Sequence, residues 1–225
     1  MDLGHQNYEQ NVMEQDYKKH LLDILYVRSF KYDPDKGFTL SSGAKSDVYI
    51  DVKKTALSAE GMQLVGYACY QEIKLAPVDG IGGLTLGADP IAYATAMVST
   101  QYGKPIDVFV VRKEPKGHGT GQWIEGNLNP GANVVIIEDV LTTGNSAIQA
   151  VKRAREAGYN VVGVLALVDR EEGGADNLLK ECNCKVKSVF TKSDLMEAHE
   201  KAEEEKETEK ANESKKARQA EKPVF

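Results

Sequence analysis

Five short apolar segments, rich in Val and Ile and with little polar alternation, constrain the fold of this 225-residue chain more than any other feature. The segments that we expect to be strands are residues 80–83, 106–111, 133–137, 161–168 and 186–189. Continuous apolar strands are buried on both faces, which is typical of a parallel sheet covered by helices. Stretches with helical spacing supply the crossover connections, at residues 88–101, 145–157 and 175–181. The sequence therefore predicts an α/β fold.

The segment that precedes these strands has a different pattern. Residues 12–30 show the spacing of an amphipathic helix, with Leu21 and Leu25 on its apolar side. Residues 38–51 are typical of two short strands around a Ser-Gly turn, and residues 59–74 return to helical spacing. We therefore expect a small N-terminal unit that leads into the α/β core.

The composition changes near the C-terminus. Residues 197–222 are mostly Glu, Lys and Ala, with no large apolar residue between Met196 and Val224. Such a segment can be helical by propensity but has no apolar stripe to bury. We expect a single globular domain over residues 1–195 and a charged, solvated helical or disordered tail over residues 196–225. Binding of a partner protein by this tail is an alternative.

Composition also excludes several classes of protein. The net charge of -6 argues against a general nucleic-acid binder, which needs a basic surface. No apolar run reaches the length of a membrane span, and the polar N-terminus carries no signal pattern. Three cysteines do not form a disulfide framework, and the spacing of Cys182 and Cys184 is not that of a zinc site. We expect a cytoplasmic protein that binds neither nucleic acid nor membranes.

Residues 134–146 combine an apolar strand, two carboxylates and a hydroxyl-rich turn. Glu138 and Asp139 follow four β-branched residues, and Thr and Gly residues then lead into a predicted helix. The free N–H groups and the dipole of a helix start form an anion site that suits a phosphate. The two carboxylates would repel that phosphate but suit neutral donors such as the 2- and 3-hydroxyls of a ribose. A turn that merely caps a helix is the alternative, which the acidic pair disfavours.

This segment resembles the 5-phosphoribosyl 1-pyrophosphate (PRPP) motif of type I phosphoribosyltransferases. The resemblance implies the type I phosphoribosyltransferase fold, a Rossmann-like parallel sheet flanked by helices with a small N-terminal hood. The hood would come from about residues 12–55 and the core from about residues 56–195. The residues that the resemblance assigns to PRPP binding are Glu138, Asp139, Val140, Leu141, Thr142, Thr143, Gly144, Asn145 and Ser146.

A basic, glycine-rich segment follows the predicted strand 106–111. Arg112, Lys113, Lys116 and His118 lie within seven residues of one another in an acidic protein. Mobile cationic loops cover phosphorylated substrates and exclude water. At an effective dielectric constant near 20, a cation about 4 Å from a phosphate charge contributes roughly 4 kcal/mol before desolvation. A solvated surface loop that is basic by chance is the alternative.

The pattern Arg-Lys-Glu-x-Lys-x-His-Gly resembles the catalytic loop of orotate phosphoribosyltransferases. The resemblance implies that Arg112, Lys113, Lys116 and His118 contact the pyrophosphate as the catalytic residues. It also implies a homodimer, because much of this loop reaches into the site of the neighbouring subunit in that family. His118 has a second candidate role, protonation of the leaving oxygen, because histidine titrates near neutral pH. Mg²⁺ would bind mainly through PRPP oxygens and need few protein ligands.

Candidate residues for the base lie at two further places. Arg170 follows the predicted strand 161–168, and a guanidinium fork suits the carboxylate and the adjacent carbonyl of orotate. A structural pair of Asp169 and Arg170 at the surface is the alternative. By resemblance, Arg170 and Thr142 contact orotate, and Tyr49 and Ile50 of the hood flank it.

The sequence departs from one branch of the family at two positions. Residues 82–87 resemble the family's pyrophosphate loop, but Leu86-Gly87 stands where that branch has Tyr-Lys. Ser41 stands where that branch has a hood lysine. These two phosphate contacts are therefore not carried over.

The implied reaction joins orotate to C1 of PRPP, releases pyrophosphate and yields orotidine 5′-monophosphate for pyrimidine (UMP) biosynthesis. Its transition state resembles the oxocarbenium-like centre of glycoside hydrolysis and needs no covalent nucleophile. Transfer to another base and non-catalytic sensing of PRPP are the alternatives. The basic loop and Arg170 argue against purines, and the loop argues against a sensor. A third alternative is an enzyme whose tail docks onto the next enzyme of the pathway.

Overall fold

A six-stranded sheet forms the centre of the computed structural model, which describes residues 3–39, 43, 45–115 and 122–220. The strands, in their order across the sheet, are β10 (Val186–Thr191), β9 (Asn160–Asp169), β8 (Asn133–Leu141), β5 (Gly80–Leu84), β6 (Asp107–Val111) and β7 (Ile124–Glu125). The first five are parallel, and only β7 is antiparallel to its neighbour. The predicted α/β fold is confirmed, although the short strand β7 was not predicted.

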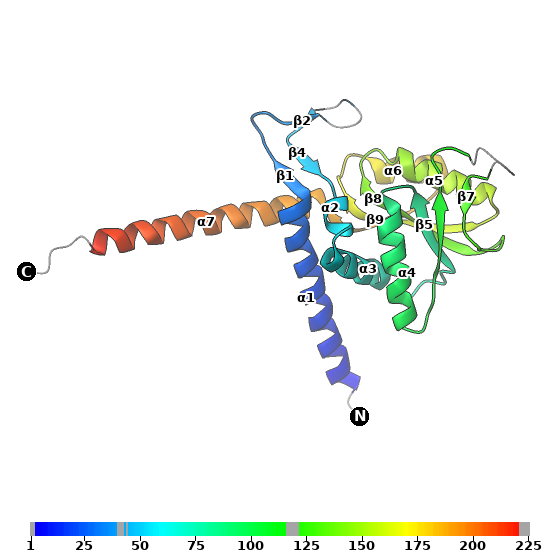
Figure 1. The fold of residues 1–225 in the computed structure, drawn as a ribbon, viewed down its shortest axis with the longest axis horizontal. Helices are drawn as coiled ribbons and strands as arrows, with labels where there is room; N and C mark the ends of the chain where they lie inside the picture. Colours follow the sequence, from blue (N-terminus) through cyan, green and yellow to red (C-terminus); the bar gives the residue numbers. More distant parts are fainter. Residues whose placement is uncertain (1–2, 40–42, 44, 116–121, 221–225) are drawn as a thin grey trace, which may run out of the picture.

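Helices cover both faces of this sheet (Figure 1). On one face, α3 (Ala59–Ile73) and α4 (Ala88–Gln101) pack over Val135 and Ile137 of β8. On the other face, α5 (Asn145–Glu156) and α6 (Gly174–Cys182) pack over Val134 and Ile136. Successive side chains of a strand point to opposite faces, so the continuous apolar run of β8 supplies both cores.

The N-terminal unit consists of α1 (Leu3–Ser29), four short strands and α2 (Lys53–Ala56). Residues 38–51, predicted to form two strands, contain three: β2 (Phe38–Thr39), β3 (Lys45–Ser46) and β4 (Val48–Ile50). Strand β2 pairs with β3, whereas β4 pairs with β1 (Phe30–Tyr32), a strand that was not predicted. Both pairs are antiparallel. The expected second strand is interrupted at Asp47, whose carbonyl accepts a hydrogen bond from the backbone of Asp33 at 2.9 Å. Each half therefore pairs with a different partner.

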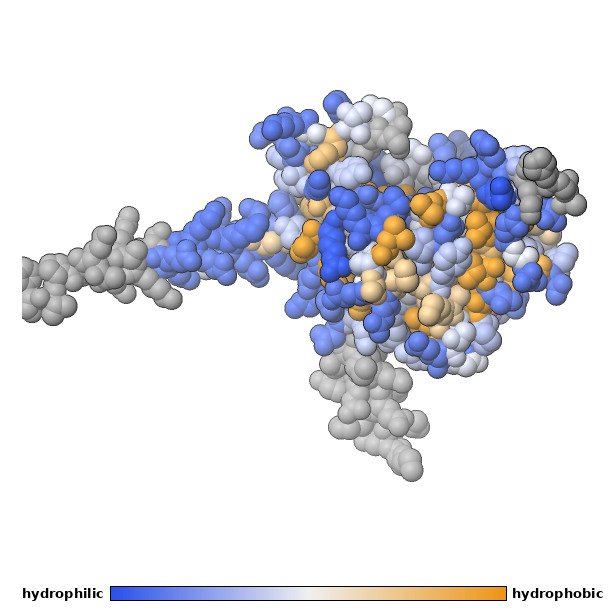
Figure 2. All heavy atoms as spheres, viewed as in Figure 1, coloured by the Kyte–Doolittle hydropathy of each residue, from blue (hydrophilic) through white to orange (hydrophobic). Residues whose placement is uncertain are grey.

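The last helix, α7 (Lys192–Ala220), projects away from the body of the protein (Figure 1). Its start is anchored by the fully buried Leu195 and by the ring of His199. That ring lies 5.1–6.0 Å from the rings of Tyr26, Phe30 and Tyr32. Farther along, the described side chains are exposed and hydrophilic (Figure 2). In the part of the chain that the structure describes, even the longest helices are too polar to cross a membrane.

A close approach of α3 and α4 depends on Gly66. A β-carbon at this position would lie 2.6 Å from the backbone oxygen of Ala94, a distance that real contacts do not reach. Gly66 is fully buried within α3, where alanine would otherwise be favoured by about 1 kcal/mol. The packing of the two helices therefore overrides helix propensity at this position.

Gly66→Ala is expected to lower the free energy of unfolding by about 1–3 kcal/mol, because the added methyl group must push α3 and α4 apart. Urea denaturation followed by circular dichroism measures this change. Gly163→Ala is the matched control, since its β-carbon would meet the oxygen of Lys185 at an ordinary 3.6 Å. Equal effects of the two substitutions would contradict the role of close helix packing.

Candidate functional site

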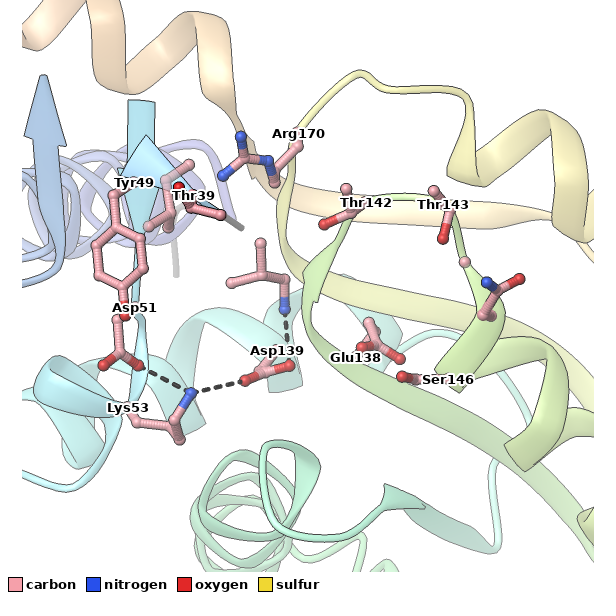
Figure 3. Close-up of a pocket in the computed structure, with 14 residues that line it drawn as sticks. Thr39, Tyr49, Asp51, Lys53, Glu138, Asp139, Thr142, Thr143, Ser146 and Arg170 are labelled. Atoms are coloured by element: carbon pink, nitrogen blue, oxygen red, sulfur yellow. Dashed lines mark hydrogen bonds and ion pairs between the residues drawn. The ribbon is translucent and has the colours of Figure 1, made fainter. Parts of the chain in front are cut away.

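An open cavity of about 710 Å³ lies at the carboxyl ends of β8 and β9, beneath the N-terminal strands (Figure 3). Parallel α/β sheets place their ligands at this edge. The residues that line the cavity are Thr39, Tyr49, Ile50, Asp51, Lys53, Glu138, Asp139, Val140, Thr142, Thr143, Gly144, Asn145, Ser146 and Arg170. The segment 138–146, Arg170 and the hood residues Tyr49 and Ile50, which are far apart in the sequence, thus share one cavity.

The turn between β8 and α5 has the geometry of a phosphate site. Gly144 has a φ of +83°, and a β-carbon there would also approach the oxygen of Gly174 to 2.9 Å. The turn is braced by Asn177, whose side-chain amide donates to the carbonyl of Thr143 at 3.0 Å. Helix α5 then begins at Asn145, so its first N–H groups have no partner within the helix. The start of α5 lines the cavity together with Thr142 and Thr143, and an anion is favoured beside such free N–H groups.

Glu138 and Asp139 lie inside β8. The prediction that they follow the end of the strand is therefore wrong. Strand β8 pairs with β5 only as far as Ile136, whereas its pairing with β9 continues to Leu141. The ladder with β9 therefore keeps the backbone extended through Glu138 and Asp139. Leu141 itself is fully buried, and its carbonyl accepts from the backbone N–H of Arg170 at 2.9 Å.

The two carboxylates of this pair differ in their surroundings. Glu138 is 9% exposed, and burial, assisted by the negative charge of Asp139, raises its pKa from the ordinary 4.5 to about 8. The Asp139 side chain is 19% exposed, and its Oδ1 accepts from the N–H of Val140 at 2.9 Å. At neutral pH, Glu138 is therefore a hydrogen-bond donor as well as an acceptor, and Asp139 is the more accessible carboxylate.

Arg170 is buried, with 3% exposure, and joins the core to the hood. Its Nε donates to Glu172 at 2.9 Å, and its Nη2 donates to the hydroxyl of Ser46 at 3.1 Å and the carbonyl of Val48 at 3.4 Å. Within the described residues, Nη1 has no such partner. The alternative of a surface pair between Asp169 and Arg170 is therefore not supported, because Arg170 is buried, its printed partners are Glu172, Ser46 and Val48, and it lines the cavity.

Three cavity residues were not assigned a role from the sequence: Thr39, Asp51 and Lys53. The ammonium group of Lys53 lies 2.8 Å from Asp51 Oδ1 and 3.6 Å from Asp139 Oδ2. Burial alone lowers the pKa of Lys53, but the hydrogen bonds and charges of Asp51 and Asp139 outweigh it and raise the pKa above its ordinary value. The sequence feature that could have indicated a cation here is the pair Lys53-Lys54, shortly after β4.

The basic loop begins beside β6 and outside the cavity wall. The backbone N–H of Arg112 donates to the carbonyl of Trp123 at 2.9 Å, and its guanidinium contacts Glu125 at 3.3 Å. Arg112 and the exposed Lys113 do not line the cavity. Lys116 and His118, the other two residues assigned to the pyrophosphate, lie outside the described residues.

The segment after β5, which resembles a pyrophosphate loop, lies against the acidic pair. A β-carbon at Gly87 would approach the carboxylate of Asp139 to 2.4 Å. The hydroxyl of Thr85 donates to Asp89 at 2.6 Å and ties this segment to the first turn of α4. The departure from lysine at position 87 therefore coincides with a position where a side chain would have to displace the Asp139 carboxylate.

Known proteins with similar sequences decide the family. No family model matches the chain. Orotate phosphoribosyltransferase of Aquifex aeolicus is 50% identical over 179 residues, which are 80% of this chain and 97% of the Aquifex protein. This chain belongs to the orotate phosphoribosyltransferase family. The Nostoc orotate phosphoribosyltransferase is 44% identical over 186 residues, 81% of this chain and 87% of its own length.

Solved structures of this family have the same fold. Mycobacterium tuberculosis orotate phosphoribosyltransferase in complex with Fe(III) dicitrate matches with a TM-score of 0.69 and 37% identity, over 80% of this chain and 98% of that one. The same enzyme in complex with PRPP matches with a TM-score of 0.64 and 31% identity, over 80% and 92%. The family resemblance drawn from the sequence is confirmed.

The raised pKa of Glu138 predicts a pH dependence of stability. Between about pH 4.5 and 8 the folded protein holds a proton that the unfolded chain has released, so stability falls as the pH rises through this window. The loss is at most about 1.4 kcal/mol per pH unit. Urea unfolding at several pH values should give a shallower fall for Glu138→Gln than for the wild type. Glu181→Gln, at an exposed carboxylate, is the control and should keep the wild-type slope.

Proposed function

We propose that this protein, as a member of the orotate phosphoribosyltransferase family, transfers the 5-phosphoribosyl group of PRPP to orotate. The products are orotidine 5′-monophosphate and pyrophosphate, in pyrimidine biosynthesis. One observation carries the assignment of the site. A phosphate turn, an acidic pair and a buried arginine, which bind a phosphate, a ribose and an anionic base respectively, line a single cavity.

The 5-phosphate of PRPP binds at the start of α5. There the N–H groups of the first turn and the hydroxyls of Thr142, Thr143 and Ser146 surround the space beside Gly144. The ribose lies over the acidic pair, where Asp139 accepts from its hydroxyl groups and protonated Glu138 can donate or accept. Charge-assisted hydrogen bonds of this kind contribute about 1.5–3 kcal/mol each.

Orotate binds on the hood side of the ribose, against Arg170. Nε and Nη2 of this arginine are held by Glu172, Ser46 and Val48, and these contacts fix the plane of the guanidinium. Nη1 is then directed to the substrate, and a charged donor of fixed orientation suits a carboxylate. Tyr49 and Ile50 line the same part of the cavity and exclude water from the face of the base.

The basic loop supplies the charge that the departing pyrophosphate requires. Arg112, Lys113, Lys116 and His118 contact this group, as the resemblance of their pattern to the family's catalytic loop implies. Mg²⁺ neutralises further charge when bound, held mainly by PRPP oxygens. The ionised carboxylate of Asp139 would suit such an ion because Mg²⁺ prefers oxygen donors, and no cluster of three or more metal-binding side chains occurs among the described residues.

The active form is a homodimer in which the basic loop of each subunit serves its partner's site. An apolar strip of this chain supports the dimer. Tyr93 and Met97 lie four residues apart on α4 and are 47% and 66% exposed, and Leu86, just before the helix, is 59% exposed. Side chains at this spacing share one face of a helix, and exposed apolar faces mark protein–protein contacts.

The enzyme acts in the cytoplasm. Cys69, Cys182 and Cys184 are all buried and none forms a disulfide, which is typical of proteins in a reducing compartment.

Orotate consumption tests the activity directly. Purified protein with PRPP and Mg²⁺ should lower the absorbance of orotate and release one pyrophosphate for each orotate consumed. Uracil and adenine, which lack the carboxylate, should show turnover that is lower by about 100-fold or more, because the charged donor of Arg170 then has no partner. Turnover with either of these bases but not with orotate would contradict the substrate assignment.

Arg170→Gln should raise the KM for orotate by about tenfold or more and leave the KM for PRPP within about twofold, because the charge-assisted bond to the carboxylate is lost. Steady-state kinetics with each substrate varied in turn measures both constants. Ser46→Ala is the control, since it removes one bond between the arginine and the hood but keeps the charge. If Ser46→Ala raises the KM for orotate as much as Arg170→Gln does, the arginine acts only by holding the hood.

A further inference from the structure

Lys53 is a charged group of the cavity that no family motif in the sequence accounts for. Among the described residues that line the cavity, the cations are Lys53 and Arg170. Arg170 is 3% exposed and held by the hood and Glu172. The Lys53 side chain is 42% exposed, and its ammonium group lies between Asp51 and Asp139 (Figure 3). It is thus the more accessible cation of the two.

The backbone of Lys53 is held firmly while its side chain remains free to change partners. Helix α2 starts at Lys53, shortly after β4, and is anchored by buried Thr55 and Ala56. The hydroxyls of Thr55 and Ser29 are 2.8 Å apart and tie α2 to the end of α1. Lys54, the neighbouring residue, is exposed and does not line the cavity. Only one of two adjacent lysines is therefore aimed at the site.

The loop after β5, Thr85-Leu86-Gly87, carries no cation beside Asp139. A β-carbon at position 87 would lie 2.4 Å from the Asp139 carboxylate, so no lysine can extend from there without displacing it. Helix α2 approaches the same carboxylate from the hood side and brings an ammonium group to 3.6 Å. Lys53 therefore supplies positive charge beside Asp139, where the neighbouring loop carries none.

We propose that Lys53 is a PRPP-binding residue whose ammonium group contacts the pyrophosphate at C1 of the ribose. This inference rests on the proposed function. The 5-phosphate occupies the turn at Thr142–Ser146, and Asp139 lies between that turn and Lys53 (Figure 3). A ribose over Asp139 thus has its 5-phosphate on the α5 side and its C1 substituent toward Lys53.

Binding of PRPP exchanges the partners of Lys53. Without substrate, the ammonium group neutralises Asp51 and Asp139, which lowers the repulsion that an incoming polyanion meets. With substrate, the flexible stem of the lysine carries the charge from Asp139 to the pyrophosphate. The Asp139 carboxylate is then free to accept hydrogen bonds from the ribose hydroxyls.

Three variants test this role: Lys53→Gln, Lys53→Arg and the control Lys54→Gln. The measurements are calorimetric binding of PRPP with Mg²⁺, the KM for each substrate and the temperature of unfolding. Lys53→Gln should weaken PRPP binding and raise the KM for PRPP by about tenfold or more, with the KM for orotate within about twofold. Lys53→Arg should restore most of the affinity, and Lys54→Gln should match the wild type.

A purely structural ion pair would give a different result. Lys53→Gln would then lower the unfolding temperature but bind PRPP as the wild type does, and this outcome would overturn the proposal. An equal loss of affinity in Lys54→Gln would also overturn it, because general charge would explain the effect. If the wild type binds PRPP but does not consume orotate, the proposed function fails, while the binding comparison still decides the role of Lys53.

Discussion

The site depends on the unequal lengths of the two ladders that flank β8. Pairing with β5 ends at Ile136, whereas pairing with β9 continues to Leu141. Beyond Ile136, pairing with β9 alone keeps the strand extended. Glu138 and Asp139 are thus held on an extended strand, and both line the cavity.

Each cation that lines this cavity contacts more than one partner, so the charges do not form isolated pairs. Burial keeps Glu138 protonated at neutral pH, and the ionised Asp139 shares the ammonium of Lys53 with Asp51. Arg170 is likewise shared, between Glu172 and the hood. Each cation thus holds carboxylates or carbonyls before the anionic substrates arrive.

The parts of the fold and site that the sequence predicts are those encoded by contiguous residues. The β-branched runs indicate the parallel sheet, and the phosphate turn with its acidic pair lies within residues 138–146, so local pattern is sufficient. Lys53 and Asp139 are 86 positions apart and meet only because α2 docks beside the sheet, which no local pattern reveals. The end of β8 was placed too early for a similar reason: its extension depends on the length of β9. The contacts of Arg170 with Ser46 and Val48 also require the tertiary arrangement.

The anchored but projecting helix α7 affects how the molecule moves through solution. At 1.5 Å per residue, its 29 residues form a rod about 44 Å long, and its start packs against the body through Leu195 and His199. A rod attached to a compact domain raises the frictional coefficient far more than it raises the mass. The protein should therefore sediment slowly and elute early for its 24.7 kDa, and its assembly state is better read from light scattering than from elution volume.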